Sequence, residues 1–215
     1  MEPELERIRS KVAFLTSRFP YPIEKGDKLR LYHQIKTLSK TFDIYLFAIG
    51  EGTTNKADFE QVLPLIKELH FFKLDYFSRI YSLISGLFSG IPMQVLFFFN
   101  HKIQKKITAS LAAIQPDHVF CQLARMAPYA RNLPYPKTLD FMDAFGFGME
   151  KRANVAGGLL RMVYWREAKL MKAYEKSLTT DFDHFTIISE QDKKYMEFAQ
   201  VDCDMIVLPN GIDPS

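Results

Sequence analysis

The sequence has few cysteines and little excess charge, and these two shortages already argue against several classes of protein. Its two cysteines, Cys121 and Cys203, lie far apart and have no metal-ligand spacing. Such sparse use of cysteine is typical of a reducing, cytoplasmic setting. The five histidines are scattered, so no metal site is predicted. The formal net charge of +3 is too small to indicate a nucleic-acid partner.

Glycine is scarce where common nucleotide-binding motifs require it. The loop after the first apolar segment contains one glycine, Gly26, whereas a dinucleotide site needs the pattern Gly-x-Gly-x-x-Gly. The P-loop pattern is also absent. Ordinary dehydrogenases and P-loop NTPases therefore lose their main support, and no cofactor is predicted.

The sequence also lacks a clear targeting or membrane-spanning segment. Its first residues are acidic and polar, which does not resemble a secretory signal. The stretch from Ile80 to Phe99 carries no formal charge, but Gly86, Gly90 and Pro92 interrupt it, so a membrane span is disfavoured. We expect a cytoplasmic protein, and peripheral contact with the inner face of the membrane is a second expectation.

Short apolar runs alternate with helical segments along the whole chain. Strands are predicted at residues 11–16, 42–49, 71–74, 117–123, 137–142, 184–188 and 205–208. Helices are predicted at 28–39, 56–69, 101–114, 144–179 with a break near Gly157 and Gly158, and 190–199. This order is typical of an α/β, Rossmann-like fold, in which a doubly wound, mostly parallel sheet has helices on both faces. One compact domain is expected.

The loop after the first strand is the first candidate site. It joins the carboxyl end of a strand to the amino end of a helix, where free backbone amides favour an anion. Asp27 is predicted to be the N-cap, and Gly26 would let the backbone approach a ligand closely. The basic residues that would complement a phosphate are Arg18, Lys25 and Lys28. The alternative is a plain turn with solvated lysines.

Asp143 is the second candidate. It falls at the carboxyl end of the strand that contains Asp140, where a carboxylate faces the ligand cleft and can bind sugar hydroxyls or accept a proton. The alternative is that Asp143 caps the helix that follows.

Two further strand ends carry polar residues. Gln122 could contact a polar ligand, although a core Cys121 beside a surface Gln122 is the favoured interpretation. Ser189 and Glu190 begin the helix at 190–199, and a capping role explains Ser189 sufficiently.

An apolar and basic region forms the last candidate. Lys102, Lys105 and Lys106 follow an apolar stretch, and this combination suits an anionic membrane surface. Burial of the apolar residues against the sheet is the alternative. The apolar face would be formed by Phe77, Ile80, Tyr81, Ile84, Leu87 and Phe88.

Three segments resemble glycosyltransferase family 4, especially the bacterial enzymes of exopolysaccharide and cell-envelope synthesis. The strongest is the run from Phe14 to Arg30, which includes Lys25-Gly26-Asp27-Lys28. The second is Asp140-Phe141-Met142-Asp143, followed by a long helix with Tyr174-Glu175. The third, Leu208 to Asp213, is similar to the point where family members cross into a second domain.

The resemblance implies a GT-B fold, in which two Rossmann-like domains face each other across a cleft. Residues 1–209 would be the N-terminal, acceptor-side domain, and residues 210–215, with Asn210 and Gly211, would begin the crossing to the donor-binding domain. Family members transfer a sugar with retention of configuration and need no bound metal. The partners implied are a nucleotide-sugar and a glycan or lipid-linked acceptor.

The resemblance also suggests roles for two parts of the site. Gly26 and Asp27 would lie against the donor phosphates or the acceptor, and Asp143 would contact the transferred sugar, although many relatives have histidine there. The paired glutamates of the family belong to the second domain, so this chain alone is predicted to be inactive. A non-catalytic module that binds a membrane surface or a polysaccharide is the rival interpretation.

Overall fold

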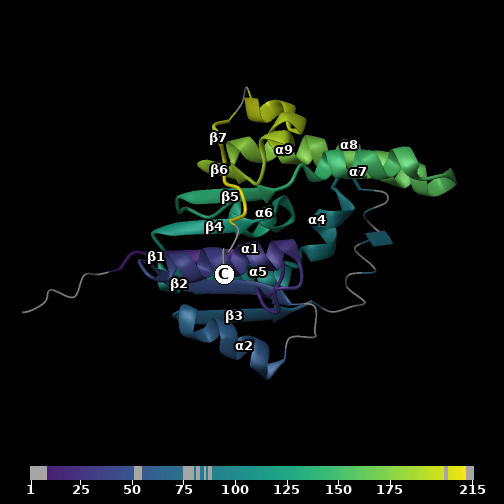
Figure 1. Ribbon diagram of the computed structural model, residues 1–215. Coiled ribbons are helices and arrows are strands. Elements are labelled where there is room, and N and C mark those ends of the chain that lie inside the picture. Colours follow the sequence, from purple (N-terminus) through teal and green to yellow (C-terminus); the bar gives the residue numbers. More distant parts are fainter. Residues whose placement is uncertain are drawn as a thin grey trace, which may run out of the picture.

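The computed structural model describes residues 9–50, 55–74, 80, 83–84, 86, 89–200 and 203–211. Among these residues a seven-stranded sheet has the order β3-β2-β1-β4-β5-β6-β7, and all of its strand pairs are parallel (Figure 1). The predicted α/β, doubly wound fold is confirmed, and the sheet is parallel throughout. The strands are β1 Lys11–Thr16, β2 Asp43–Gly50, β3 Glu68–Lys73, β4 His118–Gln122, β5 Lys137–Met142, β6 His184–Ile187 and β7 Met205–Val207.

The helices follow the strands in alternation, as predicted. They are α1 Gly26–Leu38, α2 Lys56–Val62, α4 Met93–Phe98, α5 His101–Ile114, α6 Ala127–Ala130, α7 Phe145–Val155, α8 Gly158–Ser177 and α9 Glu190–Tyr195. The break between α7 and α8 lies at Gly157 and Gly158, as expected, and Gly158 has a φ of 55° that suits glycine. The helix predicted to reach Leu69 is wrong at its end, because Pro64 lies in a 3₁₀ turn that closes α2, and β3 begins at Glu68.

The two faces of the sheet bury different sets of side chains, because successive residues of a strand point to opposite faces. On β1, Val12 and Phe14 pack with residues of α1 and α2 such as Leu31 and Val62. Their neighbours on the strand pack on the opposite face, with residues of α4, α5, α6 and α8. Every strand is therefore covered or flanked by helix, which explains why the strands read as short continuous apolar runs.

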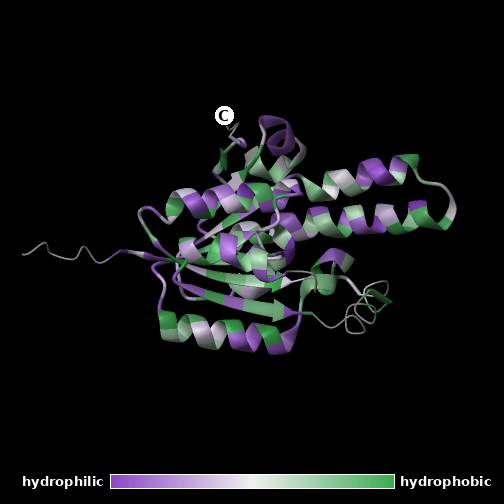
Figure 2. Cartoon of the chain, turned by 60° about the horizontal axis from the view of Figure 1, so that its bottom comes forward, coloured by the Kyte–Doolittle hydropathy of each residue, from purple (hydrophilic) through white to green (hydrophobic). Residues whose placement is uncertain are grey.

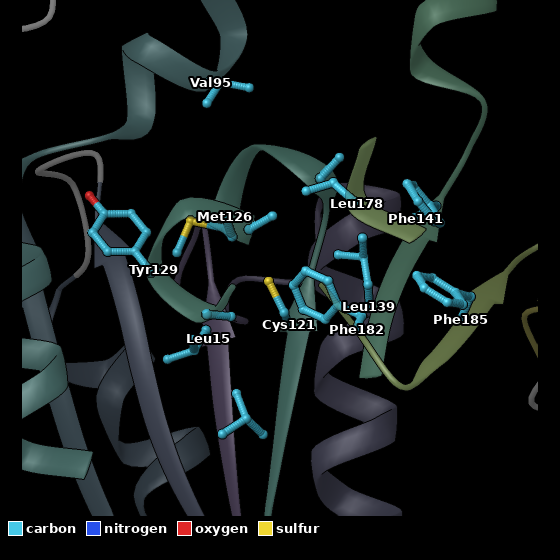
Figure 3. Close-up of a cluster of buried hydrophobic side chains, with 14 of the residues drawn as sticks. Leu15, Val95, Cys121, Met126, Tyr129, Leu139, Phe141, Leu178, Phe182 and Phe185 are labelled. Carbon is cyan, nitrogen blue, oxygen red and sulfur yellow. The ribbon is translucent and has the colours of Figure 1, made fainter. Parts of the chain in front are cut away.

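The larger core lies between the central strands and the helices of this second face. Its side chains come from β1, β4, β5 and β6 and from the connections after them, and Figure 3 shows Cys121 and Leu139 at its centre. Burial raises the pKa of the Cys121 thiol, so this cysteine is a core residue without reactive character. Tyr129, at the edge of this core, donates to the Phe98 carbonyl at 2.7 Å and accepts from the Asn100 amide at 2.8 Å, which joins α6 to the start of α5.

The uncharged stretch is divided between core and surface. Val95 and Phe98 are buried in α4, whereas Ile80, Ile84 and Ile91 are exposed. The other residues of the predicted apolar face, Phe77, Tyr81, Leu87 and Phe88, lie outside the described residues. Among the described helices, none combines the length and the apolar character that crossing a membrane requires.

Candidate functional site

The order of the strands reverses direction between β1 and β4, which makes their carboxyl ends a topological switch point. The chain runs from β1 outward to β2 and β3, and then crosses to β4 on the other side of β1. Ligands of open α/β sheets bind at such a switch point, outside the carboxyl ends of the strands. Ser17 and Arg18 follow β1, Leu123 follows β4, and Asp143 follows β5.

Asp27 is the hub of the polar contacts at this switch point. Its Oδ2 atom lies 2.5 Å from Arg18 Nη1 and 3.7 Å from Arg125 Nη2. Its backbone carbonyl accepts from Gln122 Nε2 at 3.1 Å. The structure thus brings Gln122, a separate candidate in the sequence, together with Arg18 and Asp27 of the first candidate loop.

Two predictions about these residues are wrong. Asp27 is not the N-cap, because α1 begins at Gly26 and Lys25 occupies the cap position without a side-chain hydrogen bond. Asp27 instead lies in the first turn, where it accepts from the Lys28 amide at 3.1 Å. Gln122 is not a surface residue, since only 2% of it is exposed. Its buried amide fastens β4 to the start of α1.

Arg125 is a residue of the site that the sequence analysis missed. Its Nε donates to Ser17 Oγ at 3.1 Å, and its guanidinium lies 4.4 Å from the centre of the Phe98 ring. Both contacts hold the guanidinium against the carboxyl ends of β1 and β4, beside Asp27. The available signal was its position, because it lies just beyond a strand end in an otherwise apolar run.

The first turn of α1 is open to a ligand. Lys25 and Gly26 are exposed, Lys28 is half-buried, and no side chain caps the helix. A Cβ atom at Gly26 would meet nothing within 4 Å. The fold therefore places no steric demand for glycine here, and close approach of a ligand remains a prediction. The arrangement can bind an anion through backbone amides and flanking cations.

A residue with a positive φ angle lies at or just after the end of each of the adjacent strands β4 and β5. Leu123 after β4 has a φ of 73°, and Met142 at the end of β5 has a φ of 65°. The pairing of β5 with β6 is also irregular between Asp140 and Met142. Positive φ is unfavourable for such residues, and backbone of this kind clusters at functional sites. Here it turns the chain sharply out of the sheet just before Asp143.

Asp143 lies at this turn, and the capping alternative for it is wrong. The N-cap of α7 is Ala144, and the Asp143 side chain makes no capping hydrogen bond to that helix. Asp143 reaches solvent, yet the protein that surrounds it raises the pKa of its carboxyl through burial, and the Asp192 carboxylate acts in the same direction. The charges of Arg125 and Arg152 act in the opposite direction.

Glu175 on α8 is a buried carboxyl close to Asp143. Burial raises its pKa to about 8, with a further contribution from the Asp143 charge. Its Oε1 accepts from the Gly146 amide at 3.2 Å, which joins α8 to the first turn of α7. The sequence analysis used Glu175 only as a marker of resemblance. Its burial depends on the packing of two helices, so no local pattern revealed it.

Two cavities meet at Glu175. The first is a small apolar pocket beside Arg125, between the carboxyl ends of β4 and β5 and helices α4 and α8. The second has a volume of about 270 Å³ and lies between α7, α8 and α9, with Tyr195 on its wall. The residues lining the first pocket are Gln94, Leu123, Ala124, Arg125, Phe141, Phe145, Met171 and Glu175.

The remaining predicted residues lie away from this cluster or serve the scaffold. Ser189 is an N-cap, as predicted, and its Oγ accepts from the Asp192 amide at 3.0 Å. Glu190 is exposed in the first turn of α9, and Gly211 is exposed near the last described residue. Asn210 accepts from Arg30 Nη1 at 3.0 Å, so the segment after β7 is tied to α1.

The predicted membrane-surface lysines lie on α5. Lys102, Lys105 and Lys106 are exposed, whereas the apolar residues of the same helix, including Ile103 and Ile107, are buried in the core. The burial alternative concerned the apolar stretch before α5, and the two described residues of its predicted face, Ile80 and Ile84, are exposed. Within the described part of the chain, histidine, cysteine and carboxylate side chains form no group of three that could hold a metal.

Solved structures with a similar fold include plant glycosyltransferases. One is UGT2 of Phytolacca americana, in complex with UDP-2-fluoro-glucose and pterostilbene. Its match covers 100% of this chain and 56% of that chain, with 14% identity and a TM-score of 0.56. A UDP-glucosyltransferase from Polygonum tinctorium matches over 95% of this chain and 53% of its own, with 12% identity and a TM-score of 0.49. No family model and no curated protein sequence matches.

The likeness to UGT2 supports the fold alone. The chain has a Rossmann-like fold of the kind found in GT-B glycosyltransferases, and it spans about half the length of UGT2. At 14% identity the similarity carries no information on individual residues. Roles for the residues at the switch point therefore have to be argued from their geometry.

Proposed function

We propose that this chain is the acceptor-side domain of a glycosyltransferase, which moves a sugar from a nucleotide-sugar to a glycan or lipid-linked acceptor. The observation that carries the proposal is the cluster at the carboxyl ends of β1, β4 and β5. There Arg18, Asp27 and Arg125 are linked within 3.7 Å, beside the exposed start of α1. The GT-B-like fold supports the proposal, as does the resemblance of the segments from Phe14 to Arg30 and from Asp140 to Asp143 to family 4.

The start of α1 would bind the negative part of the substrates. The Lys28 amide donates to Asp27, so the amides that precede it in the first turn, together with the helix dipole, would attract an anion. Lys25 and Lys28 flank these amides, and Arg125 lies 3.7 Å from Oδ2 of Asp27, which is in the same turn of α1. Asp27 would hold Arg18 and Arg125 in place, because both guanidinium groups converge on its carboxylate. The donor phosphates are the anion that this arrangement suits.

Asp143 would act on the sugar. Burial raises the pKa of the Asp143 carboxyl, and a carboxyl with a raised pKa can exchange a proton with a hydroxyl more readily than an ordinary aspartate. The Asp143 side chain is exposed and therefore accessible to a substrate, and it does not cap α7. In a retaining, metal-independent transfer, which family 4 resemblance implies, this carboxyl would contact the transferred sugar while Arg125 balances its charge.

Catalysis would require a second domain on the other side of the cleft. This chain spans about half the length of UGT2, and in a GT-B enzyme of family 4, which the sequence resembles, the nucleotide-sugar would be held by a second domain. The 215-residue chain alone is therefore expected to bind an acceptor weakly and to turn over nothing.

The test uses the longer protein with both domains and a panel of labelled nucleotide-sugars. We expect sugar transfer, and we expect Asp143→Asn to lower kcat by about 100-fold or more because it removes a group that exchanges protons. Glu60→Gln, on the exposed face of α2 at the edge of the sheet, is the matched control and should retain full activity. Absence of transfer from every activated donor, or an Asp143→Asn variant at the wild-type rate, would overturn the proposal.

A further inference from the structure

Helices α7 and α8 form a hairpin whose tip carries exposed apolar side chains. Figure 2 shows the two helices projecting together past the arrowheads of the strands, with hydrophobic residues at both helix ends beside the connecting turn. Val155 is 88% exposed, Leu159 76% and Met162 68%, and Leu160 and Trp165 are also exposed. Apolar side chains with this degree of exposure, gathered at one end of a projecting element, indicate a surface that contacts another phase or molecule.

The charges of the tip have one sign. Between residues 151 and 166 the sequence contains Lys151, Arg152, Arg161 and Arg166 and no acidic residue. The acidic residues on either side are engaged elsewhere. Glu150 pairs with Lys172, and buried Glu167 accepts from the Met93 and Gln94 amides at 2.9 and 3.0 Å. The apolar tip therefore lies within a positive field.

A shallow groove continues this surface along α8. Its lining combines Trp165 with Arg166, Lys169 and the ion pair of Lys172 with Glu150, and its volume is about 560 Å³. Arg166 also donates to the carbonyls of Gly86 and Ser89, which places these two residues beside α8. Ile84 and Ile91, on either side of these two residues, are exposed as well.

We propose that the tip of this hairpin inserts into an anionic phospholipid bilayer. Leucine, methionine and valine side chains would enter the boundary between headgroups and acyl chains. The exposed Arg152 and Arg161 would bind lipid phosphates, and Trp165 would lie at the interface, where aromatic residues are enriched. The charge complementarity favours this partner over an uncharged surface. This inference rests on the hairpin alone and is independent of the proposed sugar transfer.

The hairpin replaces α5 as the membrane-binding element. On α5 the basic residues Lys102, Lys105 and Lys106 are exposed, but the apolar side chains of that helix are buried against the sheet. Charge alone attracts a protein only weakly to the surface and inserts nothing. The hairpin combines exposed apolar and basic groups, and both contributions are needed for stable docking.

Trp165 provides a direct measurement, because it is the single tryptophan of the chain. The 215-residue chain is mixed with vesicles of phosphatidylcholine, with and without phosphatidylglycerol, and binding is measured by co-sedimentation and by Trp165 fluorescence. We expect binding to the anionic vesicles, a blue shift of the emission, and quenching by lipids brominated on their acyl chains. Binding should weaken as salt is added.

Two sets of substitutions locate the contact. Leu159→Gln combined with Met162→Gln should lower partitioning by about tenfold or more, because both apolar groups are lost from the tip. Arg161→Gln should lower it by about fivefold. The matched control changes Lys102, Lys105 and Lys106 to Gln and should have little effect. All of these side chains are exposed, and circular dichroism verifies that each variant folds.

Three results would overturn the proposal. The first is an unchanged Trp165 emission with anionic vesicles at low salt. The second is loss of binding in the α5 variant while the hairpin variant binds normally. The third is a concentration-dependent dimer that the Leu159 and Met162 changes abolish, since the tip would then bind a second copy of the chain. Each result is obtained without a sugar donor, so failure here leaves the transfer proposal standing.

Discussion

Arg30 and Asp140 form a buried ion pair that joins α1 to β5. Arg30 Nε lies 2.9 Å from Asp140 Oδ2, and both side chains are almost entirely shielded from solvent. The same guanidinium donates to the Leu208 carbonyl at 2.7 Å and to Asn210 Oδ1 at 3.0 Å. One residue therefore connects the first helix, the central sheet and the segment after the last strand, directly behind the candidate site.

We expect Arg30→Met to lower the free energy of unfolding by about 3–5 kcal/mol, because it leaves the Asp140 charge buried and uncompensated. Urea denaturation measures the change. Lys36→Met, in the exposed last turn of the same helix, should alter stability by less than about 0.5 kcal/mol. The double change of Arg30→Met with Asp140→Leu should recover most of the loss, because no buried charge then remains. A single Arg30 variant as stable as the Lys36 control would show that the pair is unimportant.

Glu175 should make stability depend on pH between about 4.5 and 8. Its pKa rises from an ordinary value of 4.5 to about 8 in the folded protein, so the folded state holds this proton more tightly than the unfolded chain. The stabilisation linked to that proton is full below about pH 4.5 and is lost as the pH rises toward 8.

Glu175→Gln removes this ionisation and leaves an amide oxygen that can accept from Gly146. The variant should match the wild type near pH 4.5 and exceed it by a few kcal/mol near pH 8. Denaturation curves across this range measure the difference in the free energy of unfolding between the two proteins. The contributions of the other titrating groups largely cancel in this difference. Parallel stability profiles for the two proteins would contradict the prediction.

Gly146 and Gly148 of α7 offer a matched pair of glycine-to-alanine changes. A Cβ at Gly146 would lie 2.7 Å from Lys172 Cγ and 2.9 Å from the Lys172 amide nitrogen, whereas one at Gly148 would meet nothing within 4 Å. Gly146→Ala should destabilise the protein by about 1–3 kcal/mol, since the backbone of α8 has to move.

Gly148→Ala should stabilise the protein by up to about 1 kcal/mol, because alanine favours the helix. Thermal unfolding of the two variants measures both effects. Equal changes at the two positions would mean that α7 and α8 do not pack as closely as the structure shows.

Local patterns predicted the elements well, because each strand is a short apolar run and each long helix has its own periodicity. The bounds of β1, β5 and α5 agree with the predicted ranges of 11–16, 137–142 and 101–114. Errors arose where neighbours decide the outcome. Pro64 lies in a 3₁₀ turn that follows α2, so the end of that helix was placed too late. Aspartate is a residue type that favours the N-cap position, but the Asp27 carboxylate instead forms an ion pair with Arg18.

The position of the candidate site was predictable in part. Strand ends can be read from the sequence, and parallel strands bring their carboxyl ends to one edge, so Arg18, Asp27 and Asp143 were identified. Arg125 and Glu175 were not, because their importance depends on partners in other elements. Gln122 was assigned to the surface, since nothing local shows that α1 covers the end of β4.

The sequence by itself determined the alternation of strands and helices, the absence of common nucleotide-binding motifs, and the strand ends where polar residues collect. These are properties of short segments, set by apolar periodicity and by glycine and proline. The tertiary structure alone decided that Arg30 pairs with a carboxylate 110 residues away, that Glu175 is buried, and that the apolar tip of α7 and α8 remains exposed. Contact and burial are set by which faces meet, and distant segments meet only in the folded chain.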